Sequence, residues 1–139
     1  MVYLILGPSG SGKTRYLIEE ANREKANGNG NIVFVDTDDS HIFTLDYSVR
    51  LINAAKYNLE CIGQFYGFIA GIASRDYDIE KIYLDGIYEI LDLKDENLLK
   101  LVNKLDWLAK EYNIEIFMGL NREEGELPEG IKAEVKVLS

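Results

Sequence analysis

The chain of 139 residues has the length of one domain and is long enough to bury a hydrophobic core. Hydrophobic residues make up 47% of it and charged residues 28%, which is typical of globular domains that fold in water. The formal net charge of −9 argues against a protein that binds the phosphate backbone of nucleic acids, because such binding needs a basic surface. We therefore expect a single domain over residues 1–139 with no nucleic-acid partner.

A single cysteine, Cys61, excludes an internal disulfide. Because it lies in an apolar segment, we expect it to be a small buried hydrophobe. The apolar residues 2–6 follow no basic segment and lead straight into a glycine-rich stretch, so they predict a strand rather than a signal peptide. The apolar stretch 61–74 is too short, and too broken by Gln64, to span a bilayer. We expect a cytoplasmic protein that does not insert into membranes.

The first predicted strand leads into a segment that fits the Walker A pattern GxxxxGK[ST] in full: Gly7, Pro8, Ser9, Gly10, Ser11, Gly12, Lys13 and Thr14. Glycines between a buried strand and a helix let the backbone turn tightly, so that N–H groups and the positive end of the helix dipole point at one anion. Lys13 is expected to neutralise the β- and γ-phosphates of a nucleotide, and the Thr14 hydroxyl to hold Mg²⁺. We count the next residue, Arg15, with the nucleotide-binding segment.

The chain then continues as a helix and a second strand. Apolar residues at helical spacing from Leu17 predict a helix to about residue 26, and residues 27–31 supply the turn that ends it. Residues 32–35 are β-branched or aromatic, which predicts a short strand buried on both faces. An acidic segment, residues 36–40, follows this strand.

Two further helices are predicted before the next strand. Apolar residues at positions 45, 49, 52 and 55 predict one helix, and residues 61–74 predict another that is apolar nearly all round. Gly63, Gly67 and Gly71 would fall along one side of this second helix and allow another backbone to approach closely. We favour packing of these glycines onto the sheet or a neighbouring helix over a subunit interface, which would make the protein a homo-oligomer.

The last third of the chain continues the alternation of strands and helices. Residues 82–85 predict a strand, and apolar residues from 98 to 112 predict a helix with Asp95 as its N-cap. Residues 114–118 predict a fourth strand, a polar loop follows, and residues 133–138 alternate like an edge strand. This order predicts a three-layer α/β domain with a mainly parallel sheet of about five strands. The direction of the last strand stays open, because the loop before it is barely long enough for a parallel crossover.

Carboxylates follow two of the predicted strands. Asp85 stands in the Walker B position, at the end of an apolar strand, where a carboxylate holds Mg²⁺ directly or through water. Hydrolysis needs a second carboxylate to orient the attacking water, but the position after Asp85 is Gly86. We therefore look to the end of the second strand and prefer Asp38 over Asp36 and Asp39. At least two of these three carboxylates are expected to cap a helix or face water.

With the Walker A segment at 7–14, a second strand ending in Asp36-Thr37-Asp38, and Asp85 as Walker B, the chain resembles the RecA-like class of P-loop ATPases. The resemblance implies ATP as substrate, Mg²⁺ as cofactor, catalytic roles for Lys13, Asp38 and Asp85, and the fourth strand between the Walker A and Walker B strands. Asp38 matches the place of the catalytic carboxylate in RecA, where the family usually has Glu. In the segment where the family carries a polar residue that senses the γ-phosphate, this chain has Gly119. Asn121 or Arg122 are the substitutes for that role.

Other chemical patterns are set aside. Lys132 and Lys136 stand where related ATPases carry a basic finger that acts on a neighbouring subunit, but lysines on an exposed strand are more often solvated, and we do not carry the role over. Residues 103–106 match the guanine-recognition tetrapeptide NKxD, but they lie within a predicted helix instead of after a strand. His41 is the only histidine, so a histidine metal cluster is excluded, and we expect it on the surface or in a loop.

The sequence leaves three functions open. The leading one is Mg²⁺-dependent binding and slow hydrolysis of ATP. The second is a small phosphotransferase acting on a nucleoside or metabolite hydroxyl, against which stands the absence of clustered arginines that would form a lid. The third is an adaptor whose nucleotide state controls association with a partner or with itself.

Overall fold

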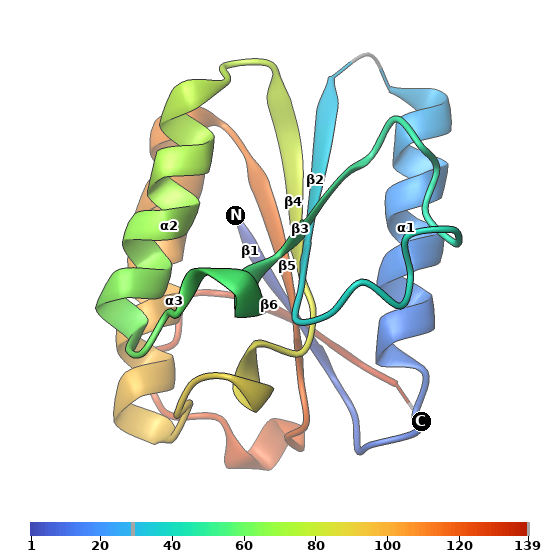
Figure 1. Ribbon diagram of the computed structural model, residues 1–139. Coiled ribbons are helices and arrows are strands. Elements are labelled where there is room, and N and C mark those ends of the chain that lie inside the picture. Colours follow the sequence, from blue (N-terminus) through green and yellow to red (C-terminus); the bar gives the residue numbers. More distant parts are fainter. Residues whose placement is uncertain (29, 139) are drawn as a thin grey trace.

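The computed structural model describes residues 1–28 and 30–138, which contain six β-strands and three α-helices (Figure 1). In chain order the elements are β1 (Val2–Leu6), α1 (Lys13–Asn27), β2 (Asn31–Asp36), β3 (Arg50–Asn53), α2 (Ile62–Arg75), β4 (Ile79–Leu84), α3 (Asp95–Tyr112), β5 (Glu115–Leu120) and β6 (Glu134–Val137). Short 3₁₀ helices occupy η1 (Ala54–Tyr57), η2 (Ile87–Glu89) and η3 (Glu124–Glu126). The predicted turn 27–31 includes residue 29, which lies outside the described residues.

The strands form one parallel sheet in the order β3-β2-β4-β5-β1-β6. β5 lies between β1 and β4, so the predicted place of the fourth strand, between those that lead into residues 7–14 and Asp85, is confirmed. β6, whose direction the sequence left open, pairs in parallel with β1. The connection over residues 121–133, which includes η3, is therefore sufficient for a parallel crossover.

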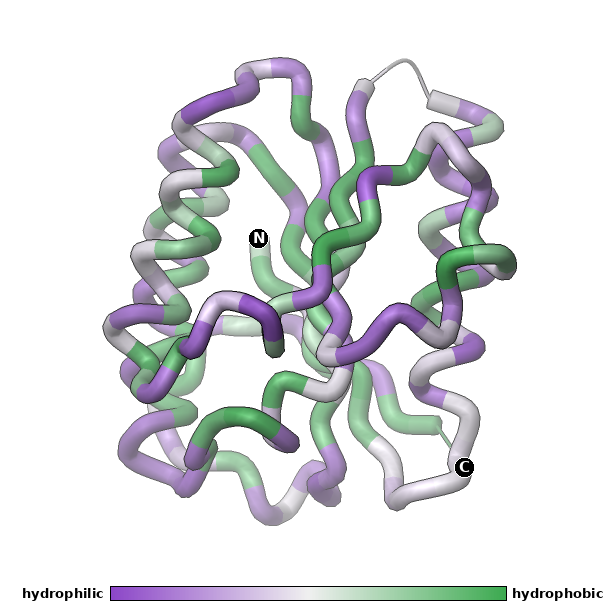
Figure 2. Tube along the Cα trace, viewed as in Figure 1, coloured by the Kyte–Doolittle hydropathy of each residue, from purple (hydrophilic) through white to green (hydrophobic). Residues whose placement is uncertain are grey.

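Helices cover both faces of the sheet, with α1 on one side and α2 and α3 on the other (Figure 1). Because successive residues of a strand point to opposite faces, each central strand contributes side chains to two cores, and most of its buried residues are apolar. The core toward α1 contains Ile5, Leu17, Ile18, Ala21, Ile32, Phe34, Tyr83 and Phe117. The larger core toward α2 and α3 contains Leu4, Val35, Phe65, Ile69, Leu84, Leu101, Leu105 and Met118. Figure 2 shows these hydrophobic residues gathered along the strands and the inner sides of the helices.

The predicted helix through positions 45, 49, 52 and 55 is wrong. Residues 37–49 form an irregular connection, and residues 50–53 form β3, a sixth strand at the edge of the sheet beside β2. Leu45 and Val49 are buried against the α1 core, so their spacing reflects two anchor points of a loop rather than one face of a helix. The carboxylate of Asp46 accepts bonds from the N–H and hydroxyl of Ser48, and this local turn competes with helical backbone bonding.

The prediction that the glycines of α2 pack against a neighbour is also wrong. All three are exposed, and a Cβ atom added at Gly67 or Gly71 would meet no atom within 4 Å. At Gly63 the nearest atom would be the Cys61 sulfur at 3.9 Å. The inner side of α2 is instead formed by Phe65, Ile69 and Ala73. No helix within the described residues is long and apolar enough to cross a membrane.

Two smaller predictions about helix ends need correction. Cys61, expected to be buried, is exposed at the residue that precedes α2, because the apolar face of the helix begins one turn later at Phe65. Lys94 occupies the N-cap of α3, and Asp95 is the first helical residue. The carboxylate of Asp95 pairs with Arg122, which draws the loop after β5 onto the start of α3.

Candidate functional site

Residues 7–12 form a tight loop between β1 and α1 at the carboxyl edge of the sheet, and Lys13 and Thr14 are the first residues of α1. Gly10 and Gly12 have positive φ angles of 83° and 92°, which L side chains adopt at an energetic cost. Gly12 is the N-cap of α1 and offers no side-chain cap, so the first N–H groups of the helix are not bonded to a capping side chain. Such a helix start favours an anion as the partner of these donors.

Lys13 is folded back over this loop. Its Nζ donates hydrogen bonds to the carbonyl oxygens of Gly7 at 2.7 Å and Pro8 at 3.0 Å. The side chain is buried, which lowers its pKa, and the nearby charge of Asp85 opposes this shift. The ammonium group thus lies within the turn of the loop, where it is available to an anion bound by the loop amides.

Thr14 and Asp85 meet at the base of the loop. The Thr14 hydroxyl donates a hydrogen bond of 2.8 Å to Oδ2 of Asp85, which follows β4. Asp85 is 5% exposed, and burial raises its pKa, while the bond from Thr14 lowers it. A hydroxyl and a carboxylate are oxygen ligands of the kind that Mg²⁺ prefers, so this pair fits a divalent cation held together with phosphate oxygens.

Gly119, on β5, lies next to Asp85, which follows β4. A Cβ atom there would be 3.5 Å from Oδ1 of Asp85, 3.4 Å from Cδ1 of Leu17 and 3.9 Å from Cβ of Lys13. The position from which a sensor side chain was expected therefore has room for a Cβ atom in ordinary contact, and it is flanked by the side chains of Asp85, Leu17 and Lys13.

The three carboxylates after β2 have different surroundings. Asp38 is exposed and accepts hydrogen bonds from the N–H and hydroxyl of Ser40, which lower its pKa. Asp39 is exposed and lies 3.1 Å from Lys56. Two of the three thus face water, as predicted. The buried one is Asp36, which the sequence did not favour: it is 4% exposed, and burial raises its pKa to about 6.

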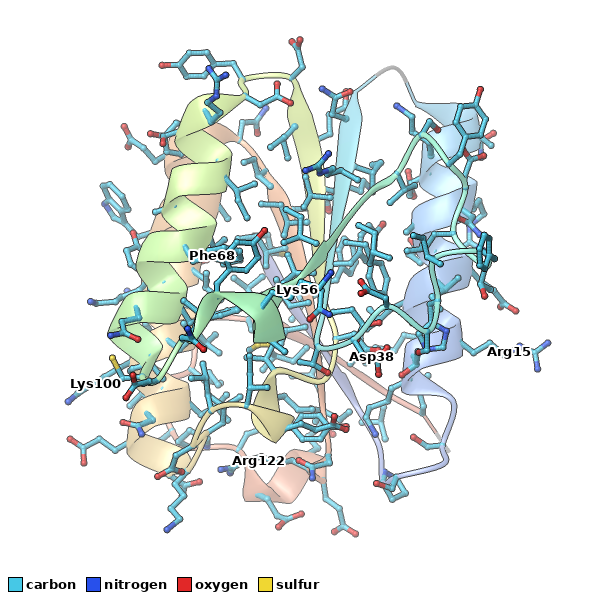
Figure 3. All side chains as sticks on the ribbon, viewed as in Figure 1. Arg15, Asp38, Lys56, Phe68, Lys100 and Arg122 are labelled. Atoms are coloured by element: carbon cyan, nitrogen blue, oxygen red, sulfur yellow. The ribbon has the colours of Figure 1, made fainter. Side chains whose placement is uncertain are left out.

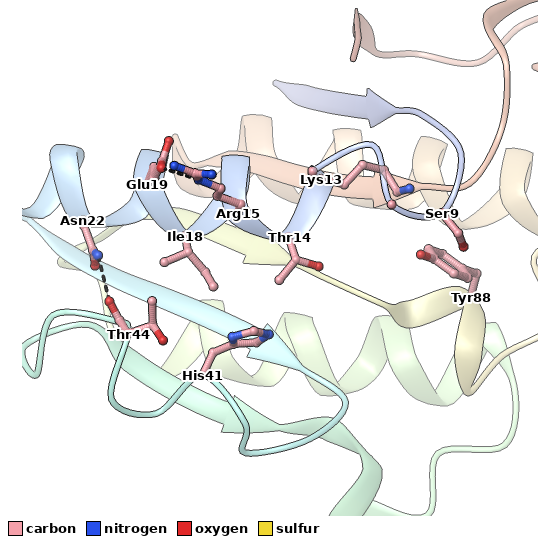
Figure 4. Close-up of a pocket in the computed structure, with 12 residues that line it drawn as sticks. Ser9, Lys13, Thr14, Arg15, Ile18, Glu19, Asn22, His41, Thr44 and Tyr88 are labelled. Carbon is pink, nitrogen blue, oxygen red and sulfur yellow. Dashed lines mark hydrogen bonds and ion pairs between the residues drawn. The ribbon is translucent and has the colours of Figure 1, made fainter. Parts of the chain in front are cut away.

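A cavity of about 700 Å³ extends from the loop along α1 (Figure 4). Its lining comes from the loop, from α1, from the segment after β2 and from η2. It consists of Ser9, Gly10, Gly12, Lys13, Thr14, Arg15, Ile18, Glu19, Asn22, His41, Thr44 and Tyr88. The Nδ2 of Asn22 donates a hydrogen bond of 3.1 Å to the carbonyl oxygen of Thr44, so α1 and residues 41–44 are tied together. Asp38 is not among the residues that line this cavity.

Arg15 and His41 occupy different parts of this cavity. The Arg15 side chain is 84% exposed, pairs with Glu19 at 2.9 Å and projects away from the body of the molecule (Figure 3). His41 lies in the loop, as expected, but its ring faces the cavity opposite Thr14 (Figure 4). The end of the cavity at the glycine-rich loop is therefore lined by Lys13 and Thr14, and the far end by Asn22 and Thr44 (Figure 4).

A second cavity of about 690 Å³ lies at the carboxyl ends of β4 and β5 and shares Tyr88 with the first. Asn121 and Arg122, the alternative sensor residues, both line it. Arg122 is committed to structural contacts, because its guanidinium donates to Asp95 and to the carbonyl oxygens of Leu93 and Glu126. Neither residue lines the cavity of the glycine-rich loop.

The tetrapeptide 103–106 lies within α3, as predicted, and its side chains have structural partners. Nδ2 of Asn103 donates to the carbonyl oxygen of Gly130, and its Oδ1 accepts from the N–H of Lys132. Asp106 pairs with Lys110 at 3.0 Å. The two hydrogen bonds of Asn103 hold the segment before β6 against α3. Lys136 is exposed, and its Nζ lies 5.4 Å from the centre of the Tyr16 ring.

Five polar residues that line the main cavity were not predicted as site residues: Glu19, Asn22, His41, Thr44 and Tyr88. His41 and Thr44 were missed because residues 45–55 were predicted as a helix, which hid the return of the chain toward α1. Tyr88 follows the turn at Gly86, where φ is +70°, and only this turn brings it opposite the loop. The sequence signal that could have identified Tyr88 was its position three residues after Asp85 in the chain.

Comparisons with known proteins do not assign this chain to a family: neither a scan against protein-family models nor a search of curated proteins found a match. The fold itself is a parallel α/β domain with a six-stranded sheet. Function is therefore inferred from the geometry of the site.

Proposed function

We propose that this protein is a minimal RecA-like P-loop ATPase, which binds ATP with Mg²⁺ and hydrolyses it slowly. The observation that carries the proposal is the hydrogen bond between Thr14 and Asp85, 71 residues apart, beside a glycine-rich loop that begins a helix. The loop alone predicts an anion site, whereas the added hydroxyl and carboxylate provide a cation site next to it. The place of β5 between β1 and β4 supports the same class of domain.

Each residue of the site has a role in this proposal. Lys13 and the amides of the loop from Gly7 to Thr14 stabilise the charge of the β- and γ-phosphates. Thr14 and Asp85 hold Mg²⁺, which supplies charge neutralisation at the phosphates when bound. Lys13 leaves the carbonyl oxygens of Gly7 and Pro8 for the phosphates, and the loop carbonyls then turn to water.

The nucleoside half of ATP has room along α1. The cavity continues from Thr14 past Ile18 to Asn22 and Thr44, and its far end is lined by both apolar and polar side chains. Such a mixture suits a sugar and a base, because the rings bury against apolar atoms and polar atoms bond to the edges. We propose that Asn22 and His41 contact this part of the ligand.

Water activation is assigned to Asp38 in this proposal. Gly86 has φ +70°, and a Cβ atom there would lie 3.1 Å from Oγ1 of Thr37, so the residue after Asp85 cannot carry a carboxylate without strain. Asp38 is accessible to solvent, and both of its bonds from Ser40 use Oδ1, which leaves Oδ2 to accept from the attacking water. Slow turnover is expected, because Asp38 does not line the cavity of the glycine-rich loop and must approach it before hydrolysis.

Calorimetric titration with ATP and a phosphate-release assay test the proposal. We expect wild type to bind ATP with Mg²⁺ and to release phosphate, and Lys13→Ala to lose both. Equal phosphate release by wild type and Asp38→Ala would remove Asp38 from the mechanism. Binding without any release would make the protein a nucleotide-dependent switch instead of an ATPase, and absence of binding would refute the proposal.

A small-molecule phosphotransferase is the second candidate, and the size of the cavity favours it. At about 700 Å³ the cavity could hold an acceptor near Thr14 if the nucleoside of ATP leaves the loop in another direction. A screen of nucleosides and hydroxylated metabolites for stimulated formation of ADP distinguishes the two. Strong stimulation by one acceptor, with a phosphorylated product, would rank this function first.

A further inference from the structure

Asp36 and Asp85 lie side by side at the carboxyl ends of neighbouring strands. β2 and β4 are parallel with Val35 opposite Leu84, and the N–H of Asp85 donates a 2.9 Å hydrogen bond to the carbonyl oxygen of Val35. The same register continued by one residue places Asp36 beside Asp85. Adjacent parallel strands are about 4.8 Å apart, and residues in register point to the same face. The two carboxylates therefore share one face of the sheet.

That face is the one covered by α1. Phe34 and Tyr83 precede the two aspartates by two residues, and both pack in the core toward α1. Because alternate residues of a strand share a face, Asp36 points to the same side as Asp85, where the Thr14 hydroxyl bonds to Asp85. The close approach of Gly86 to Thr37 keeps the segments leaving the two strands together.

Only one of the two carboxylate oxygens of Asp36 has a hydrogen-bond partner among the described residues. Its Oδ1 accepts a 2.7 Å hydrogen bond from the N–H of Thr37, whereas Oδ2 is buried with no hydrogen-bond partner among the described residues. None of the ion pairs found within residues 1–28 and 30–138 involves Asp36. A buried carboxylate without a partner is costly, and proteins normally supply a hydrogen bond, an opposite charge or a metal ion.

We propose that Asp36 is the second carboxylate of a divalent-cation site that it forms with Asp85 and Thr14, an inference that rests on the proposed nucleotide-binding function. Mg²⁺ is commonly held by one or two carboxylates, with phosphate oxygens and water as the remaining ligands. The donors here are all oxygen atoms, which suits Mg²⁺ or Mn²⁺ rather than Zn²⁺. Asp36 acts as a ligand of the cation or of its bound water.

The ligand set also determines when the cation binds. Among the described residues, no group of three or more His, Cys, Asp or Glu side chains could hold a metal ion by itself. Two carboxylates and a hydroxyl leave several coordination positions of an octahedral cation open, which the phosphates of a nucleotide can fill. The cation is therefore expected to bind much more tightly with nucleotide than without it.

Asp39 provides a matched control for Asp36. It is the same residue type in the same segment, but it is exposed, pairs with Lys56 at 3.1 Å and has no role in the proposed mechanism. Asp36→Asn keeps an oxygen that can accept from Thr37 and removes only the charge. Asp39→Asn removes a charge of equal size from the surface three residues away.

Titration of Mn²⁺, followed by its electron paramagnetic resonance signal in the presence of saturating ADP, tests the inference. We expect Asp36→Asn to weaken Mn²⁺ binding at least about tenfold, in line with the loss of a hydrogen bond or contact to a charged group. We expect Asp39→Asn to change it less than about twofold, as for an exposed charge. ADP affinity in EDTA should be the same in all three proteins. Equal Mn²⁺ affinity of wild type and Asp36→Asn overturns the inference.

The experiment also separates this inference from the proposed function. If wild type binds no ADP, the proposed function fails, and the Mn²⁺ titration is then read without nucleotide. Weaker binding in Asp36→Asn than in Asp39→Asn would still support the shared site, and equal binding would refute it. Thermal unfolding verifies that each variant is folded, and Asp36→Ser replaces Asp36→Asn if the latter does not fold.

Discussion

The ammonium group of Lys13 lies 2.7 Å from the carbonyl oxygen of Gly7, the residue at which β1 passes into the glycine-rich loop. This bond holds the buried ammonium group inside the loop. In the proposed function Lys13 exchanges its bonds to the loop carbonyl oxygens for bonds to the phosphates, so its charge is already at the loop but turns when the ligand binds.

The first prediction concerns this lysine. Lys13→Ala should lower ATP affinity at least about tenfold, because hydrogen bonds to charged groups contribute about 1.5–3 kcal/mol each. Calorimetric titration of ATP measures the loss. Lys100→Ala is the control, since Lys100 lies on α3, pairs only with Glu96 at the surface and is far from the loop (Figure 3). Equal losses in both variants would contradict a specific role of Lys13.

The second prediction compares two glycines with different backbone requirements. Gly67→Ala in α2 should raise the free energy of unfolding by about 0.5–1 kcal/mol, because the added Cβ meets open space and alanine favours a helix. Gly10→Ala should lower it by about 1–2 kcal/mol, because φ at Gly10 is +83°. Urea denaturation measures both. Destabilisation by Gly67→Ala would show that another molecule covers α2 in solution.

The third prediction concerns the space beside Asp85. At Gly119 an alanine Cβ would be in ordinary contact with Leu17 and Asp85, so Gly119→Ala should change stability by less than about 1 kcal/mol. Gly119→Val adds two methyl groups against the same neighbours and should cost about 1–3 kcal/mol and weaken ATP binding. Thermal unfolding and ATP titration of the pair provide the measurement. Unchanged ATP binding by Gly119→Val would argue against crowding of Asp85.

The fourth prediction concerns the pH dependence of stability in EDTA. Burial raises the pKa of Asp36 from its ordinary value near 3.8 to about 6, so the folded protein binds more protons than the unfolded chain between these values. This contribution favours folding below about pH 4 and is lost as pH rises through about 6. At pH 7 the buried charge then costs at most about 3 kcal/mol.

Asp36→Asn removes this penalty. The variant should be more stable than wild type by about 1–3 kcal/mol at pH 7, and the difference should shrink as the pH falls to 4. Urea denaturation in EDTA over this pH range measures it. Asp38→Asn should show no such gain, because the folded-state pKa of Asp38 is lowered by Ser40. A pH-independent difference for Asp36→Asn would mean that Asp36 is not buried in its charged form.

The fifth prediction concerns the tetrapeptide on α3. Asn103→Ala removes two hydrogen bonds to the segment before β6 and should lower the free energy of unfolding by about 1–2 kcal/mol. The ratio of ATP to GTP affinity should not change, because Asn103 does not line the cavity of the loop. Competition titrations measure this ratio. A shift toward or away from GTP would revive a role in base recognition.

The sequence was sufficient wherever one local pattern determined the outcome. The central strands β1, β2, β4 and β5 were predicted because they are buried on both faces and carry continuous apolar runs. Lys13, Thr14 and Asp85 could be placed at one edge of the sheet, because the carboxyl ends of parallel strands meet there. The prediction of a helix through residues 45–55 was wrong, because Leu45 and Val49 anchor a loop at a spacing that a helix would also show.

What only the tertiary structure decided is which polar groups lose their contact with water. Asp36, Asp38 and Asp39 are the same residue type and stand within four positions of one another. Yet Asp36 is buried beside Asp85, whereas Asp38 and Asp39 face solvent. The difference arises because the β2–β4 register and the cover of α1 enclose the first residue of the segment, while a turn at Ser40 turns the rest outward. Burial depends on neighbours distant in the chain. The sequence by itself therefore determined the glycine-rich loop, and the packing of α1 over β2 and β4 decided which carboxylate lies beside Asp85.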